Sequence, residues 1–141
     1  MIKEVVLITG DREWGTVEEE KVIRTALESV PVPSLIIHGK ARGVDKMAAA
    51  VAVDLGHYVA EVPALWDRDG RGAGPIRNKV MVEMLTLMEL RAPDVFVYAF
   101  HDNIAESKGT KDCVNRAIKA GIVVHLFTRN GNPVEVMGQI D

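Results

Sequence analysis

Cysteine is almost absent from the sequence, with one residue, Cys113, among 141. A single cysteine cannot form a disulfide within the chain, so the fold has to rest on a hydrophobic core, and a chain of this length can bury one. No positively charged, apolar leader ending in small residues opens the sequence. We therefore expect a cytoplasmic protein, and a phage or bacterial cytoplasm fits equally well.

Long apolar runs and an excess of one charge are also missing. The longest mainly apolar region, 80–90, is interrupted by Glu83, Thr86 and Glu89 and is far shorter than the about 20 residues of a membrane span. The formal net charge is only -3 and aromatic residues make up 5%. Long nucleic acid is usually bound by basic surfaces and aromatic platforms. We therefore expect neither a membrane nor a long nucleic acid as a partner.

Histidines are few and have no ligand spacing. They fall at or near the ends of separate apolar runs, at His38, His57, His101 and His125. The common zinc sites need closely spaced pairs of histidines or cysteines. We expect no metal, and no motif indicates a cofactor.

Apolar runs typical of strands alternate regularly along the sequence with segments patterned as helices. Strands are predicted at 4–9, 34–38, 57–62, 94–100 and 122–128, and helices at 17–29, 45–55, 75–91 and 111–120. Such alternation is typical of βαβ units, and uninterrupted apolar strands indicate a sheet covered on both faces. We predict a single Rossmann-like, doubly wound α/β domain over 1–141. Its mostly parallel, five-stranded sheet has the order 3-2-1-4-5, with helices on both faces.

Two segments fall outside this alternation. Residues 66–74 are rich in glycine and charge, and we predict the longest loop there. Long loops in compact domains are often functional. Residues 129–141 contain the turn signal Asn130-Gly131 and predict a small hairpin, a tail or a contact between subunits.

The most informative stretch is 38–45, which joins the second strand to the second helix. In doubly wound sheets, ligands bind at the strand ends where the strand order reverses. Backbone N–H groups of this loop and the helix dipole suit an anion, and Arg42 adds a planar fork for phosphate oxygens. The same residues also fit an ordinary turn in which Arg42 is solvated. Asp45 either caps the helix, accepts a ribose hydroxyl, or does both.

Two other helix starts reach the same edge. Gly109 permits a close backbone approach, and Thr110 either caps its helix or binds phosphate. Arg77 lies at the positive end of a helix dipole, which a bound anion would compensate. The alternative is an ion pair of Arg77 with Asp67 or Asp69.

The loop after the first strand completes this edge. Gly10 permits a tight turn, Asp11 either binds a sugar hydroxyl or orients Arg12, and Trp14 and Trp66 are each either base-stacking or packing residues. The candidate ligand-binding residues are Gly10, Asp11, Arg12, Gly39, Lys40, Arg42, Gly43, Asp45, Gly74, Arg77, Asn78, Ser107, Gly109 and Thr110.

These strand-end motifs together resemble a known family. They are Gly10-Asp11-Arg12-Glu13-Trp14, His38-Gly39-Lys40-Ala41-Arg42-Gly43-Val44-Asp45, Pro63-Ala64-Leu65-Trp66, Ala73-Gly74-Pro75-Ile76-Arg77-Asn78, Phe100-His101-Asp102 and Ser107-Lys108-Gly109-Thr110-Lys111-Asp112. In this order they resemble the YspA-type (YpsA-related) branch of the SLOG superfamily, which includes the LOG nucleotide phosphoribohydrolases and DprA. The resemblance implies a SLOG-like domain that binds a nucleotide.

The chain departs from the family pattern at two positions. Lys40 stands where the family usually has a second glycine, which makes the turn less open or brings an ammonium group to the ligand. Cys113 stands where the phosphoribohydrolases carry the glutamate of a Gly-Gly-x-Gly-Thr-x-x-Glu motif. It is either a packed thiol or, at a helix start, one of lowered pKa. Arg77 matches an arginine of those enzymes, so the resemblance implies binding more than hydrolysis.

We therefore predict a sensor or carrier of a nucleoside monophosphate or an ADP-ribose-like ligand. The alternative is a nucleoside 5′-monophosphate phosphoribohydrolase, with Arg77 and Asp112 as candidate catalytic residues. Hydrolysis of the glycosidic bond needs a carboxylate near the ribose, and Asp112, Glu106 and Asp45 are the substitutes for the missing glutamate. A third reading is a DprA-like nucleic-acid accessory protein, which the acidic balance disfavours.

The helix predicted at 75–91 is apolar on more than one face. One face is needed for the sheet. We expect the other to form a homo-oligomer.

Overall fold

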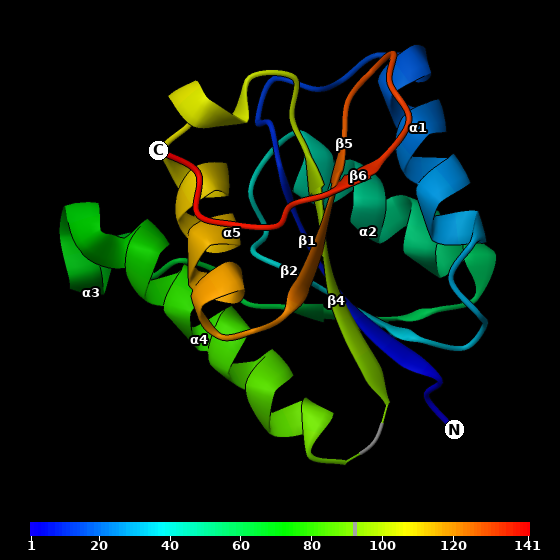
Figure 1. Ribbon diagram of the computed structural model, residues 1–141, viewed down its shortest axis with the longest axis horizontal. Coiled ribbons are helices and arrows are strands. Elements are labelled where there is room, and N and C mark those ends of the chain that lie inside the picture. The colour runs from blue at the N-terminus through cyan, green and yellow to red at the C-terminus, as the bar shows by residue number, and fades with distance from the viewer. Residues whose placement is uncertain (92) are drawn as a thin grey trace.

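The computed structural model describes residues 1–91 and 93–141, and its centre is a six-stranded sheet with helices on both faces (Figure 1). The strands are β1 (Glu4–Gly10), β2 (Leu35–His38), β3 (Tyr58–Glu61), β4 (Asp94–Phe100), β5 (Val123–Phe127) and β6 (Val134–Glu135). The helices are α1 (Val17–Glu28), α2 (Val44–Leu55), α3 (Trp66–Asp69), α4 (Ala73–Glu89) and α5 (Gly109–Lys119). Short 3-10 helices lie at Gly70–Gly72 (η1) and Ile104–Glu106 (η2). The predicted Rossmann-like α/β fold is confirmed.

The strand order is β3-β2-β1-β4-β5-β6. Strands β1 to β5 are parallel and have the predicted order, which reverses between β1 and β4. The addition is β6, which pairs antiparallel with β5 through Leu126 and Val134. Part of the predicted hairpin or tail at 129–141 therefore forms one edge of the sheet.

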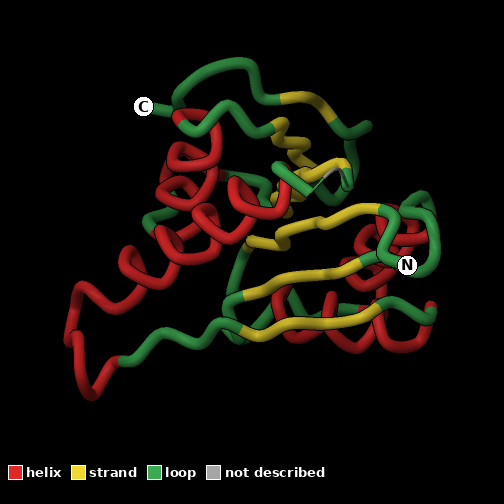
Figure 2. Tube along the Cα trace, turned by 90° about the horizontal axis from the view of Figure 1, so that it is seen from below, coloured by secondary structure: helices red, strands yellow, loops and turns green. Residues whose placement is uncertain are grey.

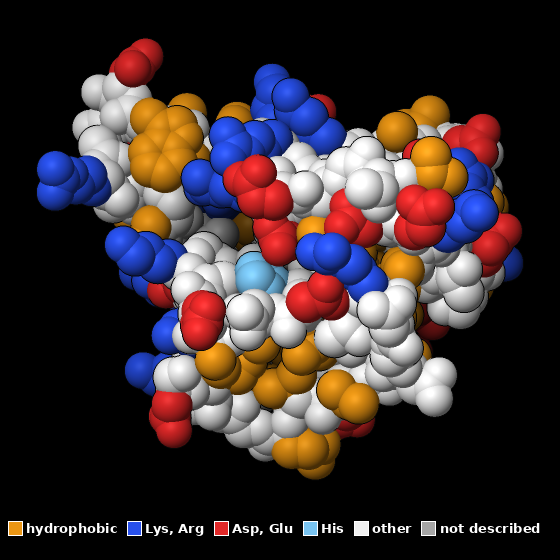
Figure 3. Space-filling model, turned by 90° about the horizontal axis from the view of Figure 1, so that it is seen from above, with side chains coloured by type: hydrophobic (Ala, Val, Ile, Leu, Met, Phe, Trp, Pro, Cys, Tyr) orange, Lys and Arg blue, Asp and Glu red, His pale blue; other side chains and the backbone are white. Residues whose placement is uncertain are grey.

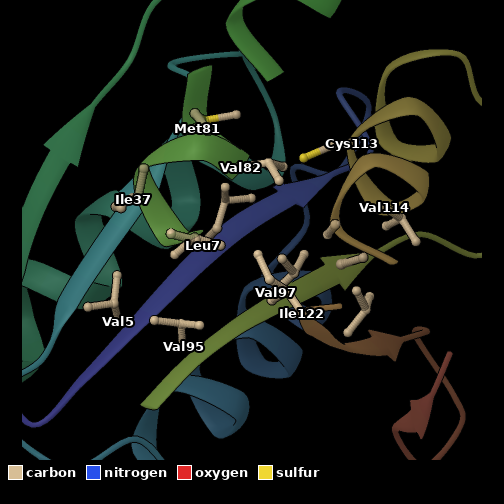
Figure 4. Close-up of a cluster of buried hydrophobic side chains, with 14 residues drawn as sticks. Val5, Leu7, Ile37, Met81, Val82, Val95, Val97, Cys113, Val114 and Ile122 are labelled. Atoms are coloured by element: carbon tan, nitrogen blue, oxygen red, sulfur yellow. The ribbon is translucent and has the colours of Figure 1, made fainter. Parts of the chain in front are cut away.

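Side chains of β1 alternate between two hydrophobic layers, because successive residues of a strand face opposite sides of the sheet. Val5 and Leu7 belong to the layer with α4 and α5, whereas Val6 and Ile8 belong to the layer with α1 and α2. Figure 4 shows the first layer, which includes Cys113 of α5. Both layers are needed to bury this strand, and they fix its carboxyl end at the middle of the sheet edge.

Residues 66–74 form helical turns, so the predicted loop is wrong there. The Asp69 N–H donates to the Leu65 carbonyl at 2.8 Å, and α4 already begins at Ala73. Pro75 is tolerated because the first N–H groups of a helix have no helical partner. The glycine content of this segment favours a loop. Helical turns still form, because their backbone hydrogen bonds do not require side chains. The segment with α3 extends from the body of the molecule at the start of α4 (Figure 2).

Across the described residues, no helix has both the length and the apolar composition that crossing a bilayer requires.

Candidate ligand-binding cleft

A cleft of about 470 Å³ opens at the carboxyl ends of β1 and β4, where the strand order reverses. We call it the central cleft. A second cavity of about 430 Å³, the side hollow, shares Arg12, Ala41, Trp66 and Arg77 with it. Figure 3 looks onto this edge of the molecule, where Lys and Arg side chains gather on the left half with acidic side chains among them. The charges that line the cleft are mixed: they are Arg12, Arg71, Arg77 and Lys108 together with Asp11, Glu13, Asp45 and Asp112.

Most of the predicted ligand-binding residues come together on the central cleft. These are Gly10, Asp11, Arg12, Asp45, Gly74, Arg77, Asn78, Ser107, Gly109 and Thr110, and Asp112 lines it too. Gly39, Lys40 and Arg42 line the side hollow instead, and Gly43 is absent from the described lining of both cavities. The loop before α2 thus contributes less to the central cleft than the sequence predicts.

Three N–H groups of this loop, those of Gly39, Lys40 and Ala41, are used within the protein. Those of Gly39 and Ala41 both donate to Oδ2 of Asp45, at 3.1 and 3.2 Å. The Lys40 N–H donates to Nδ1 of His38 at 2.9 Å. The expectation that this loop presents its donors to an anion is therefore corrected, because the carboxylate of Asp45 already occupies two of them.

Asp45 is a buried carboxyl group in the wall of the cleft. Its side chain belongs to the first turn of α2, and the residue is only 6% exposed. Burial raises its pKa to about 6, although the Ala41 and Gly39 N–H groups and the nearby Arg77 favour the charged form. Asp45 therefore titrates close to neutral pH, as functional carboxyl groups often do.

Gly43, rather than Asp45, is the N-cap of α2. Its φ is 76°, and a Cβ at this position would collide with the carbonyl oxygen of Asp11. The Val44 N–H donates to the same oxygen at 3.1 Å. The glycine is needed for close contact between the loops after β1 and β2, and this contact, not a ligand, explains it.

Lys40 and Arg42 are engaged at the surface. Lys40 has a φ of 56°, in the left-handed region that favours glycine. Its Nζ lies 3.8 Å from Oε2 of Glu61. Arg42 is exposed and its Nη2 lies 2.5 Å from Oε1 of Glu13. Neither cation is turned into the central cleft.

Arg77 is the half-buried cation of the central cleft. Its Nη1 donates to the Gly39 carbonyl and its Nε to Oδ1 of Asn78 at 2.9 Å. A Cβ at Gly39 would collide with the guanidinium, so the glycine makes room for it. The predicted alternative, an ion pair with an acid of 66–74, does not form among the described residues. Burial lowers the pKa of Arg77.

Asn78 connects α4 to α5. Its Oδ1 accepts from Nε of Arg77. Its Nδ2 donates to the Gly109 carbonyl at 3.2 Å and to Oδ2 of Asp112 at 3.1 Å. The same Asp112 oxygen accepts from Nε of Arg116 at 2.9 Å. Asn78 and Asp112 are therefore already occupied in holding the guanidinium and the start of α5 in place.

The start of α5 faces the cleft. This helix begins at Gly109, and the first N–H groups of a helix have no helical acceptor. The Lys111 N–H is taken by Oγ of Ser107 at 3.0 Å. Gly109 and Thr110 both line the cleft, and Thr110 is buried. The positive end of α5 thus serves an anion better than that of α2.

Asp11 and His101 meet where the strand order reverses. Oδ1 of Asp11 accepts from the Glu13 N–H at 2.8 Å, and Oδ2 lies 3.7 Å from Nε2 of His101. Nδ1 of His101 accepts from the Asn103 N–H at 2.9 Å, so in the neutral ring the proton is on Nε2, toward Asp11. One Asp11 oxygen is therefore positioned by the backbone, and the other pairs with this ring.

Several residues of the central cleft were outside the predicted set: Thr9, Glu13, Ala41, Trp66, Arg71, Pro75, Met81, His101 and Lys108. Helical spacing could have found Met81, which follows Arg77 by one turn. Arg71 belongs to the segment predicted as a loop, so its approach to the cleft could not be foreseen. Lys108 adjoins a predicted glycine motif, and its charge was the available signal.

Cys113, which the sequence resemblance aligns with a glutamate of the phosphoribohydrolases, lies in the core beneath the cleft. It is fully buried, and burial raises the pKa of its thiol to about 12. The alternative of a reactive thiol is therefore wrong, and the packed thiol is observed. Within residues 1–91 and 93–141, no three His, Cys, Asp or Glu side chains are grouped as metal ligands would be.

Comparisons with known proteins agree with this architecture. No protein-family model matches the chain. The Gene 61 protein of Mycobacterium phage D29 is 35% identical over 130 residues, which cover 86% of this chain and 94% of that protein. The X-ray structure of DNA processing protein A (DprA) from Streptococcus pneumoniae superposes with a TM-score of 0.60 at 17% identity, over 87% of this chain. The chain spans 50% of DprA, and this likeness shows a DprA-like Rossmann fold.

Proposed function

The chain belongs to the same family as the Gene 61 protein of Mycobacterium phage D29, and we propose that its central cleft binds a nucleotide or nucleotide-derived ligand as a sensor or carrier. A nucleoside monophosphate or an ADP-ribose-like molecule has the required chemistry. Phosphate would bind Arg77 and the start of α5, and Asp11 would accept a ribose hydroxyl. The strand-end motifs further support assignment to the YspA-type branch of the SLOG superfamily.

The observation that carries this proposal is the guanidinium of Arg77. It is half-buried one turn into α4, it lines the cleft, and no acid within the described part of the chain lies at ion-pair distance. Burial disfavours its charge. A bound phosphate would compensate this effect and match the planar fork of the guanidinium.

Binding is favoured over hydrolysis by the state of the carboxylates. Cys113 replaces the glutamate and is buried, and Asp112 is engaged by Asn78 and Arg116. Glu106 lies on η2 and is not among the described residues that line the cleft. These positions leave no carboxylate where the related enzymes would place one.

A thermal-shift assay with AMP, other nucleotides and inorganic phosphate tests the proposal. A nucleotide at 100 times its dissociation constant adds about 2.7 kcal/mol to the free energy of unfolding, so the melting temperature rises. Arg77→Ala abolishes this rise. Arg68→Ala, which removes a guanidinium paired with Asp69 outside the cleft, leaves it unchanged. If no nucleotide stabilises the protein, the proposal fails.

The alternative is a nucleoside 5′-monophosphate phosphoribohydrolase. The observation in its favour is Asp45, whose pKa of about 6 suits a general acid or base near neutral pH. Release of free adenine from AMP, lost in Asp45→Asn, would establish this reading. Absence of free base under conditions where AMP stabilises the fold would leave the sensor or carrier.

A nucleic-acid ligand is the third candidate. DprA is a DNA-processing protein, and basic side chains gather on the face that carries the cleft (Figure 3). A single-stranded oligonucleotide in the same thermal-shift assay tests this reading. Stabilisation by the oligonucleotide but not by mononucleotides would replace the proposed ligand.

A further inference from the structure

We propose that Trp66 is the residue that recognises the base of the ligand, by stacking against its ring. The inference rests on the proposed function, because it concerns the same cleft. Stacking on Trp66 would let the cleft distinguish a nucleotide from a sugar phosphate, which has no base. Trp66 is the first residue of α3, and its indole lines both the central cleft and the side hollow. It would act as a specificity-determining residue.

The exposure of this indole is unusual for its size. Trp66 is 51% exposed, whereas the other tryptophan, Trp14, is 2% exposed and packs edge-on to Phe100 with 6.1 Å between ring centroids. Large aromatic side chains normally bury most of their area in a core. Trp14 thus acts as a core residue, and Trp66 is left with a ring face that the core does not use.

The indole of Trp66 packs over a glycine, Gly74, which has no side chain. The indole Cη2 would lie 3.5 Å from a Cβ added at Gly74, a buried residue in the first turn of α4. The tryptophan is therefore seated on the glycine backbone at the start of the helix that carries Arg77. The ring lies at the rim of the cleft, whose lining also includes Arg77.

Trp66 also has no competitor for this role. Among the described residues that line the two cavities, it is the only Trp, Tyr or Phe. It lies with Arg12 and Arg77 on the boundary that the two cavities share. A ligand with its phosphate at Arg77 therefore has one aromatic surface beside it, and a planar base is the group that gains from it.

Paired titrations of AMP and ribose 5-phosphate test this proposal, because the two ligands differ by the base. We expect Trp66→Ala to weaken AMP binding by about 5- to 150-fold, the usual effect of losing a stacking aromatic. Ribose 5-phosphate binds equally to the wild type and to this variant. Trp66→Phe retains a ring and recovers part of the AMP affinity. Tyr58→Ala removes a similarly exposed aromatic from β3, outside both cavities, and changes neither affinity.

Tryptophan fluorescence gives a second measurement. AMP quenches the emission of the wild type, ribose 5-phosphate does not, and Trp66→Phe removes the quenching. If Trp66→Ala changes the affinities for AMP and ribose 5-phosphate by the same factor, stacking is overturned while phosphate binding stands. If the wild type binds neither compound, the proposed function fails together with this inference.

Discussion

Asp45 and Arg77 are the two titratable groups that burial affects most in the wall of the cleft, and their pKa values move in opposite directions. Burial raises the pKa of the Asp45 carboxyl and lowers that of the Arg77 guanidinium. Both shifts mean that the charged form is disfavoured in the folded protein. The cleft therefore keeps charges at a cost in stability, which is typical of functional sites.

The first prediction concerns Asp45. A carboxyl group whose folded pKa is about 6 and whose ordinary value is 3.8 stabilises the fold below pH 3.8, and this contribution is lost as the pH rises to about 6. Asp45→Asn keeps an oxygen for the Gly39 and Ala41 N–H groups. We expect the free energy of unfolding of the wild type to fall by about 2 kcal/mol relative to Asp45→Asn between pH 4 and pH 7. Urea denaturation at several pH values measures it, and a constant difference would contradict the assignment.

The second prediction concerns Gly39. A methyl group there collides with the end of the Arg77 side chain, which can move, so the fold tolerates Gly39→Ala but the guanidinium is displaced. We expect the affinity for AMP to fall by at least about tenfold, as for the loss of a charge-assisted hydrogen bond, with little change in melting temperature. Gly138→Ala, where no neighbour lies within 4 Å, is the control. Unchanged AMP affinity in Gly39→Ala would show that the position of the Arg77 guanidinium does not matter for AMP binding.

At the scale of elements, ion pairs hold the start of α1 to the residue that follows β5 by two positions. Thr16 and Glu19 form a capping box, and Glu19, only 4% exposed, also lies 3.1 Å from Nε of Arg129. Arg129 in turn lies 2.7 Å from Oδ2 of Asp102, after β4. Backbone hydrogen bonds from Thr16 and Gly15 lower the pKa of Glu19. Three elements are fixed together beside the cleft.

The third prediction is that Glu19→Gln destabilises the fold by about 1 to 3 kcal/mol at pH 7, because charge-assisted hydrogen bonds are replaced by neutral ones. A lowered carboxyl pKa stabilises the fold above the ordinary value of 4.5, and this contribution disappears as the pH falls below it. The difference from the wild type should therefore shrink as the pH falls below 4.5. Glu18→Gln, an exposed change one residue away, is the control. A difference that persists at acid pH would point to packing instead of charge.

The sequence predicts elements better than it predicts how their loops are used. The period of the apolar residues identified β1 to β5 and the four long helices, because burial on the two faces of a sheet sets those periods. The same reasoning placed Gly39, Gly43 and Asp45 at the correct edge of the sheet. It could not show that Asp45 occupies the donors of its own loop, or that Gly43 contacts the Asp11 carbonyl. Those contacts join segments that only the fold brings together.

At the scale of the whole molecule, α4 has a second apolar face. Met81, Val82 and Leu85 are buried against the sheet, whereas Val80 and Leu87 are 41% and 66% exposed. A second copy of the chain that covers this face would account for it, as the sequence predicts for 75–91. The oligomer remains a prediction.

The fourth prediction tests it by light scattering. We expect the wild type to have at least twice the mass of one chain at micromolar concentration, and Leu87→Glu to be a monomer, because a buried unpaired carboxylate opposes association. Glu89→Gln, an exposed change on the same helix, should keep the oligomer. A monodisperse monomer for the wild type would refute the interface.

Arg77 and the start of α5 are proposed to bind the phosphate of a nucleotide in the central cleft. A crystal structure of the protein with AMP would show where the phosphate lies. We expect phosphate oxygens at hydrogen-bond distance from the Arg77 guanidinium and from the N–H groups of Gly109 or Thr110. AMP bound outside the central cleft, or with its phosphate on the loop before α2, would contradict it.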